Sequence, residues 1–177
     1  MTATSQTSTS AAPAPRHTFL EAGRGHYDAA TQLAKHAKLA GPADHLAGLA
    51  AECAAKAMLI DYFGSVQDNG PLSRPYSQSM RSQAQAAATS NRQLKKAVEN
   101  SQHGHMPGVW EHLVKLADGR RGSLIIGCLP QKNPFAGDPD TWDVDHRYVD
   151  SQQISKQRVT RHLEAARTLI AAYYLAQ

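Results

Sequence analysis

The 177-residue sequence has few of the features that would place a chain in a membrane or in a disulfide-stabilised class. No apolar run approaches the roughly 18 residues that a membrane-spanning helix needs, so we expect no membrane segment. Two cysteines, Cys53 and Cys128, are too few for a disulfide framework, and free thiols fit a reducing cytoplasm. Aromatic residues make up only 6% of the chain, and runs that alternate polar and β-branched residues are scarce, which disfavours a sheet-rich fold.

Several catalytic and ligand-binding motifs are also missing. The chain has no G-x-S-x-G motif, no P-loop and no G-x-G-x-x-G fingerprint. His103 and His105 share a glycine-rich loop with His112 nearby, but no two of the nine histidines have the i,i+3 or i,i+4 spacing of helical metal ligands. The five aspartates between 138 and 150 do not fit the EF-hand template. We therefore expect neither a metal nor a cofactor.

Alanine, the best helix former, is abundant instead. Apolar residues recur at spacings of three and four, which is typical of helices that pack along one face. We expect Gly41-Pro42 to end the first helix and Asp150 or Ser151 to cap the last. The stretch 123–129 fits either a short strand or a helical turn. The predicted helices cover about 18–40, 43–63, 81–101, 109–118 and 151–176.

The pattern predicts an all-α protein, an up-down bundle of four to five helices. Residues 1–17 are rich in Ser, Thr, Ala and Pro, so we interpret them as a disordered tail. The helical domain covers 18–177 and includes a longer variable middle, 65–140.

Charge is unevenly distributed along the chain, whose formal net charge is +4. Residues 74–132 hold nine Lys or Arg, including Arg120 and Arg121, against three acids, whereas residues 138–150 hold five Asp against one Arg. A basic surface of this kind can bind phosphates, although runs of like charge are more often simply solvated.

Glu52 and Lys56 are the two charged residues in the middle of the apolar helix predicted at 43–63. Their i,i+4 spacing, with Glu first, favours a pair on one helix face. The pair can be a purely structural one that orients the bundle, or Lys56 can bind a nucleotide or RNA.

Three segments in this order resemble the HEPN family (higher eukaryotes and prokaryotes nucleotide-binding). The first, DHLAGLAAECAAKAMLIDYFG at 44–64, carries Glu52 and Lys56 as that family's second helix does. The second, TWDVDHRYVD at 141–150, resembles the Arg-Tyr signature that precedes the family's last helix. The third is the closing helix, EAARTLIAAYYLAQ. The similarity covers 26–64 and 141–177.

The resemblance implies a helical bundle, usually a homodimer, that binds a nucleotide or RNA. Members often belong to bacterial toxin–antitoxin, stress or phage-defence systems, beside a small nucleotidyltransferase or another partner protein. Arg147 and Tyr148 are the matching signature residues, and Arg can bind phosphate while Tyr stacks on a base.

Catalysis is the point at which the chain departs from the family. RNase members carry an Arg, four to six residues, and then a His, and cleave RNA without a metal. The nearest match here, Arg158 and His162, has three intervening residues. We therefore expect a cytoplasmic binding protein rather than a standard HEPN RNase. Two alternatives stay open: a metal-independent endoribonuclease that uses Arg158 and His162, and a structural helical subunit that binds a protein partner.

Overall fold

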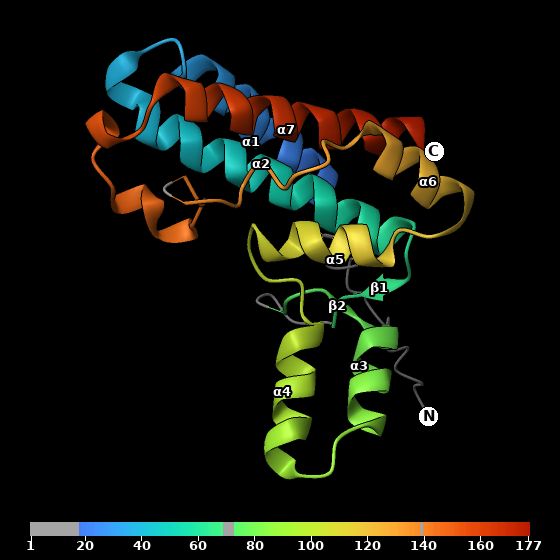
Figure 1. Cartoon of the computed structure of the whole chain (residues 1–177). Coiled ribbons are helices and arrows are strands. Elements are labelled where there is room, and N and C mark those ends of the chain that lie inside the picture. The colour runs from blue at the N-terminus through green and yellow to red at the C-terminus, as the bar shows by residue number, and fades with distance from the viewer. Residues whose placement is uncertain (1–17, 69–72, 139) are drawn as a thin grey trace, which may run out of the picture.

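The computed structural model describes residues 18–68, 73–138 and 140–177 (Figure 1). The predicted tail at 1–17 lies outside these ranges. Within them the chain forms seven α-helices and one two-stranded antiparallel sheet, which confirms the all-α bundle. None of these helices combines the length and apolar character that crossing a bilayer requires. The α-helices are α1 (Phe19–Leu33), α2 (Ala40–Asp61), α3 (Gln78–Ala86), α4 (Asn91–Ser101), α5 (Gly108–Leu116), α6 (Gly119–Cys128) and α7 (Lys156–Leu175).

Helix α2 lies at the centre of the bundle, where α1, α7 and α5 pack against it (Figure 1). Most of its alanines are fully buried and allow the neighbouring helices to approach closely. The closest approach is at Gly48, where an added Cβ would stand 2.0 Å from the Trp142 ring. The indole N–H of Trp142 donates to the carbonyl oxygen of Asp44 at 3.1 Å, so the segment before α7 is seated directly on α2.

The prediction that Gly41-Pro42 ends the first helix was wrong. Helix α1 ends at Leu33, and the short 3₁₀-helix η1 (Ala37–Leu39) leads straight into α2. Pro42 therefore occupies the first turn of α2, where a backbone N–H is not needed for helix hydrogen bonding.

The helix predicted at 81–101 is divided into two helices. Helix α3 ends at Ala86, and Ser90 caps a new helix, α4, by accepting the backbone N–H of Gln93. The two helices form an antiparallel hairpin that projects from the bundle, and we call it the basic arm (Figure 1). At its root, the segment between the predicted helices 43–63 and 81–101 contains the strands β1 (Ser65–Val66) and β2 (Tyr76–Ser77).

The ambiguous stretch 123–129 is largely helical, because α6 runs to Cys128. The predicted caps of the last helix were wrong: Ser155 caps α7 through the backbone N–H of Arg158, and Asp150 instead caps η3. The described part of the segment between α6 and α7 contains two short 3₁₀-helices. They are η2 (Val144–Tyr148) and η3 (Ser151–Gln153).

Candidate functional site

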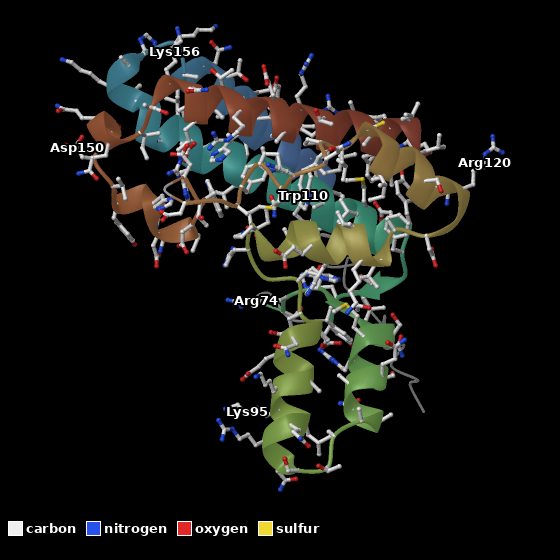
Figure 2. The ribbon with its side chains drawn as sticks, viewed as in Figure 1. Arg74, Lys95, Trp110, Arg120, Asp150 and Lys156 are labelled. Carbon is white, nitrogen blue, oxygen red and sulfur yellow. The ribbon has the colours of Figure 1, made fainter. Side chains whose placement is uncertain are left out.

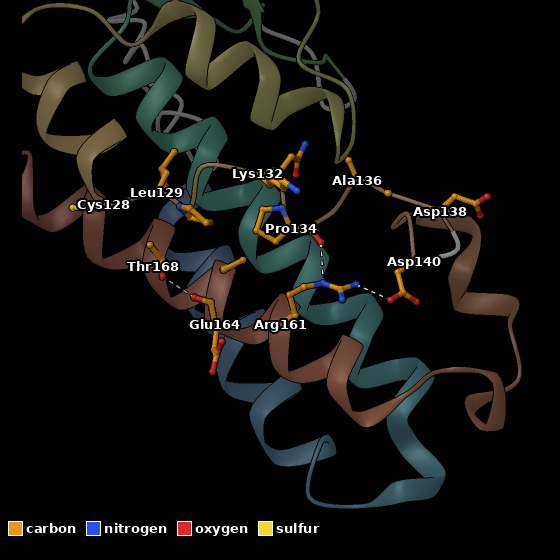
Figure 3. Close-up of a pocket in the computed structure, with 14 residues that line it drawn as sticks. Cys128, Leu129, Lys132, Pro134, Ala136, Asp138, Asp140, Arg161, Glu164 and Thr168 are labelled. Atoms are coloured by element: carbon orange, nitrogen blue, oxygen red, sulfur yellow. Dashed lines mark hydrogen bonds and ion pairs between the residues drawn. The ribbon is translucent and has the colours of Figure 1, made fainter.

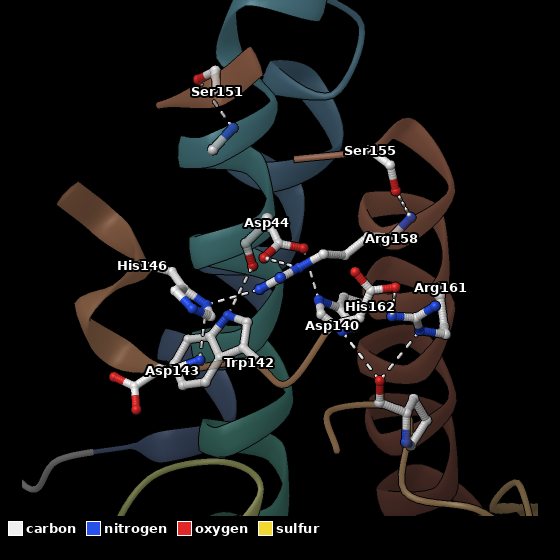
Figure 4. A network of polar contacts seen from close by, with 12 residues as sticks. Asp44, Asp140, Trp142, Asp143, His146, Ser151, Ser155, Arg158, Arg161 and His162 are labelled. Carbon is white, nitrogen blue, oxygen red and sulfur yellow. Dashed lines mark hydrogen bonds and ion pairs between the residues drawn. The ribbon is translucent and has the colours of Figure 1, made fainter. Parts of the chain in front are cut away.

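A buried carboxylate, Asp44 on α2, organises the main polar site of the bundle (Figure 4). Its two oxygens accept from two α7 side chains: Nε of Arg158 at 3.0 Å and Nδ1 of His162 at 2.7 Å. Burial removes the water molecules that would otherwise bind a carboxylate, a guanidinium and an imidazole. In a protein interior these three groups stabilise one another, because each forms the hydrogen bonds that water no longer supplies.

The second contacts of these two α7 side chains extend the site into the segment before α7. Nε2 of His162 lies 3.1 Å from the carbonyl oxygen of Pro134, and the ring stacks on Phe135. Both ring nitrogens of His162 therefore face oxygen atoms, so the ring bridges Asp44 on α2 and the segment before α7.

Arg158 donates through Nη2 to Nδ1 of His146 at 2.8 Å. The same Nδ1 accepts the backbone N–H of Asp143 at 3.0 Å, so His146 carries its proton on Nε2. We call Asp44, His146, Arg158 and His162 the Asp44 network.

The structure thus brings the two predicted catalytic residues together, but it does so inside the protein. Arg158 is 5% exposed and His162 is completely buried. Their hydrogen bonds join α7 to α2 and to the 134–146 segment. As placed, the pair cross-links three parts of the fold, and neither side chain is open to a substrate.

A surface pocket of about 660 Å³ borders this network (Figure 3). The carbonyl oxygen of Pro134, which accepts from His162, also accepts Nε–H of Arg161 at 3.3 Å. Arg161 in turn binds Asp140 at 3.1 Å. The volume lies in the range of small-molecule sites. The residues that line this pocket include Leu129, Lys132, Pro134, Asp140, Arg161 and Glu164.

Glu52 and Lys56 form the ion pair that their spacing predicts. Nζ of Lys56 lies 2.7 Å from Oε1 of Glu52, and both side chains are more than 90% buried. Nδ1 of His105 contacts the same carboxylate at 3.0 and 3.2 Å. Lys56 is therefore enclosed and neutralised, which supports the structural interpretation of the pair.

Two of the histidines noted in the sequence, His103 and His112, meet at the root of the basic arm. Nε2 of the fully buried His103 lies 2.8 Å from the hydroxyl oxygen of Ser65, and its Nδ1 lies 2.9 Å from Nδ1 of His112. Burial, followed by the neighbouring His112 and Lys56, lowers the pKa of His103 to about 4. Burial also lowers the pKa of His112. Across the described ranges, no group of three or more His, Cys, Asp or Glu side chains is arranged to hold a metal.

Arg147 and Tyr148 lie on the surface, on η2. Tyr148 is 77% exposed, and the Arg147 guanidinium lies 4.7 Å from the centre of its ring. The ion-pair partner of Arg147 is the exposed Asp145, at 3.8 Å. These two residues are therefore positioned to meet a ligand from solution.

The remaining predicted contact residues lie on α6. Arg120 is exposed and points away from the bundle (Figure 2). Arg121 donates through Nε to the carbonyl oxygen of Ala176 at 2.8 Å and lies over the Tyr62 ring. The structure does not bring them together with Arg147 and Tyr148 in any contact among the described residues.

Exposed positive charge concentrates on α4 of the basic arm. Arg92, Lys95 and Lys96 are all exposed and, at i, i+3 and i+4, share one helix face. Within the ranges described, none of the three has an ion-pair partner. Their charge is therefore available to an external anion.

Comparisons with models of protein families, with curated proteins and with solved structures find no match. Sequence reasoning missed Asp44 and His146, the two residues that complete the Asp44 network. The predicted helix 43–63 makes Asp44 its second residue, a position where an acid is typical of capping and dipole effects, so its pattern carried no signal for burial.

Proposed function

We propose that this protein binds RNA through the basic arm, as an HEPN-like helical protein of a bacterial stress, toxin–antitoxin or phage-defence system. The observation that carries the proposal is the exposed, unpaired face of Arg92, Lys95 and Lys96 on a hairpin that projects from the bundle. From Arg74 to Ser101 the chain holds five basic residues and one acid. Phosphate backbones attract such a surface, and the counterions released on contact drive binding.

The Arg147–Tyr148 pair offers a second contact of a different kind. One face of the Tyr148 ring is covered by Arg147, and its exposure leaves room for a base to stack. The family resemblance adds a homodimer, a cytoplasmic setting and a nucleotidyltransferase or other partner protein to the proposal. The helical bundle and the Glu52–Lys56 pair on α2 support that resemblance.

We propose binding rather than cleavage because Arg158 and His162 are enclosed by the Asp44 network. The endoribonuclease alternative requires both side chains to leave Asp44 and reach the surface. Cleavage of RNA that is insensitive to EDTA and is lost in His162→Gln would favour that alternative.

The test of binding is fluorescence anisotropy with a labelled single-stranded RNA over a range of salt concentrations. Neutralising three phosphate contacts in the variant R92Q/K95Q/K96Q should reduce the slope of log affinity against log salt by about 2. The matched control is K35Q/K38Q/K156Q, which removes three exposed lysines far from the arm; Figure 2 shows Lys95 and Lys156 at opposite ends of the molecule. Equal affinities for the two variants would overturn the proposal.

A further inference from the structure

Four of the seven exposed large apolar side chains among the described residues lie on α6 and α7, which pack against each other. Two of them, Leu124 on α6 and Leu175 in the last turn of α7, are 42% and 60% exposed and line the same groove of about 520 Å³. Tyr174, beside Leu175, is 43% exposed. We call this hollow the α6–α7 groove. Its lining residues are Arg120, Arg121, Leu124, Leu175, Ala176 and Gln177.

A hydrogen bond joins the two walls of the α6–α7 groove. Arg121 donates through Nε to the carbonyl oxygen of Ala176 at 2.8 Å, which ties α6 to the end of α7. Its guanidinium also lies 5.0 Å from the centre of the Tyr62 ring. Because the anchor uses Nε alone, the two terminal nitrogens have no partner among the described residues and can bind a carboxylate.

The groove is basic as well as apolar. Arg120 and Leu124 are spaced i,i+4 on α6, and Arg121 and Leu124 are spaced i,i+3, so two guanidinium groups flank one exposed leucine. Helix α6 contains no acidic residue, and neither does the chain from Thr168 onward. The nearest acid in sequence, Asp118, precedes the helix.

We propose that the α6–α7 groove docks an acidic amphipathic helix of a partner protein. Leucines of such a helix would cover Leu124 and Leu175, and its carboxylates would bind Arg120 and Arg121. This binding surface is separate from the basic arm and does not depend on the proposed RNA binding.

Charge and exposed apolar area argue against the other occupants. A second copy of this chain in a two-fold arrangement would bring the same arginines together, and like charges oppose such a contact. RNA phosphates would bind the arginines but would leave Leu124 and Leu175 in water. An acidic amphipathic helix would both cover the exposed leucines and pair with the arginines of the groove.

The probe is a fluorescent synthetic peptide of about 15 residues, long enough to form a helix, with leucines at i, i+3, i+4 and i+7 and glutamates on the other face. We expect saturable binding to the wild-type protein. The variant L124S/L175S should weaken it at least about tenfold, as loss of a central apolar anchor does. Val114→Ser, which removes a comparably exposed apolar side chain from α5, is the matched control and should leave the affinity unchanged.

A charge swap separates this docking from nonspecific apolar binding. A second peptide with lysine in place of every glutamate should bind the wild-type protein at least about tenfold more weakly. Arg120→Glu should reduce or reverse the preference of the protein for the glutamate peptide over the lysine peptide. No saturable binding, equal binding of both peptides, or unchanged affinity in L124S/L175S would each overturn the proposal. So would displacement of the peptide by a self-association that L124S/L175S abolishes, because the occupant would then be a second copy.

Discussion

Acid should destabilise this protein through His103, which lies at the root of the basic arm. Its ring is completely buried, contacts Ser65 through Nε2 and His112 through Nδ1, and its backbone N–H donates to the carbonyl oxygen of Pro75 at 2.7 Å. The His103–His112 contact needs one nitrogen with a proton and one without. When both histidines are protonated, two N–H groups face each other and the contact is lost.

The pKa of His103 gives the size of the effect. An unfolded histidine has a pKa of about 6.5, whereas burial, His112 and Lys56 lower that of folded His103 to about 4. The unfolded state therefore binds the proton first, and the contribution of His103 to stability is present above pH 6.5 and lost as the pH falls toward 4. Between pH 7.5 and pH 5 the protonation of His103 lowers the free energy of unfolding by about 2 kcal/mol, and this loss of stability approaches about 3 kcal/mol below pH 4.

The assay is urea unfolding at several pH values between 7.5 and 5, applied to the wild-type protein and to His103→Gln. We expect the variant to be less stable than the wild type at pH 7.5, but its free energy of unfolding should fall by about 2 kcal/mol less between pH 7.5 and pH 5. An NMR titration of the wild-type protein provides an independent readout, since the His103 ring should stay neutral down to about pH 5. Identical pH dependence in both proteins, or a His103 ring that titrates near 6.5, would refute the reasoning.

Two further predictions concern the buried ion pairs, and both are measured by urea unfolding at neutral pH. Asp44→Asn should lower the free energy of unfolding by about 3–5 kcal/mol, because it leaves Arg158 buried without its counter-ion. The control Asp145→Asn, in an exposed pair, should change the free energy of unfolding by less than about 1 kcal/mol. Similar losses in the two variants would contradict this view of the Asp44 network. Glu52→Gln and Lys56→Met should each cost about 3 kcal/mol or more, and the double variant should cost clearly less than their sum. Strict additivity would show that the two side chains do not interact.

The sequence was informative where local periodicity determines structure. The apolar residues of α2 and α7 recur at helical spacing, so both helices were predicted to within a few residues, and the i,i+4 order of Glu52 and Lys56 predicted their ion pair. It was less informative where one residue type has two roles. Gly41-Pro42 suits a helix end as well as a first helical turn, and only the packing of α2 against its neighbours decides between them.

The Asp44 network shows why the candidate site could not be predicted in the same way. Arg158 and His162 are four residues apart, so the sequence could place them on one helix face, but their shared partner is more than 100 positions away. A spacing rule carries no information about such a contact, since the fold alone brings α2 and α7 together. An Arg–His pair on one helix face has the same local pattern whether it faces a substrate or a buried carboxylate. The chemistry of such a pair therefore depends on the third group that it meets, and in this protein that group is Asp44.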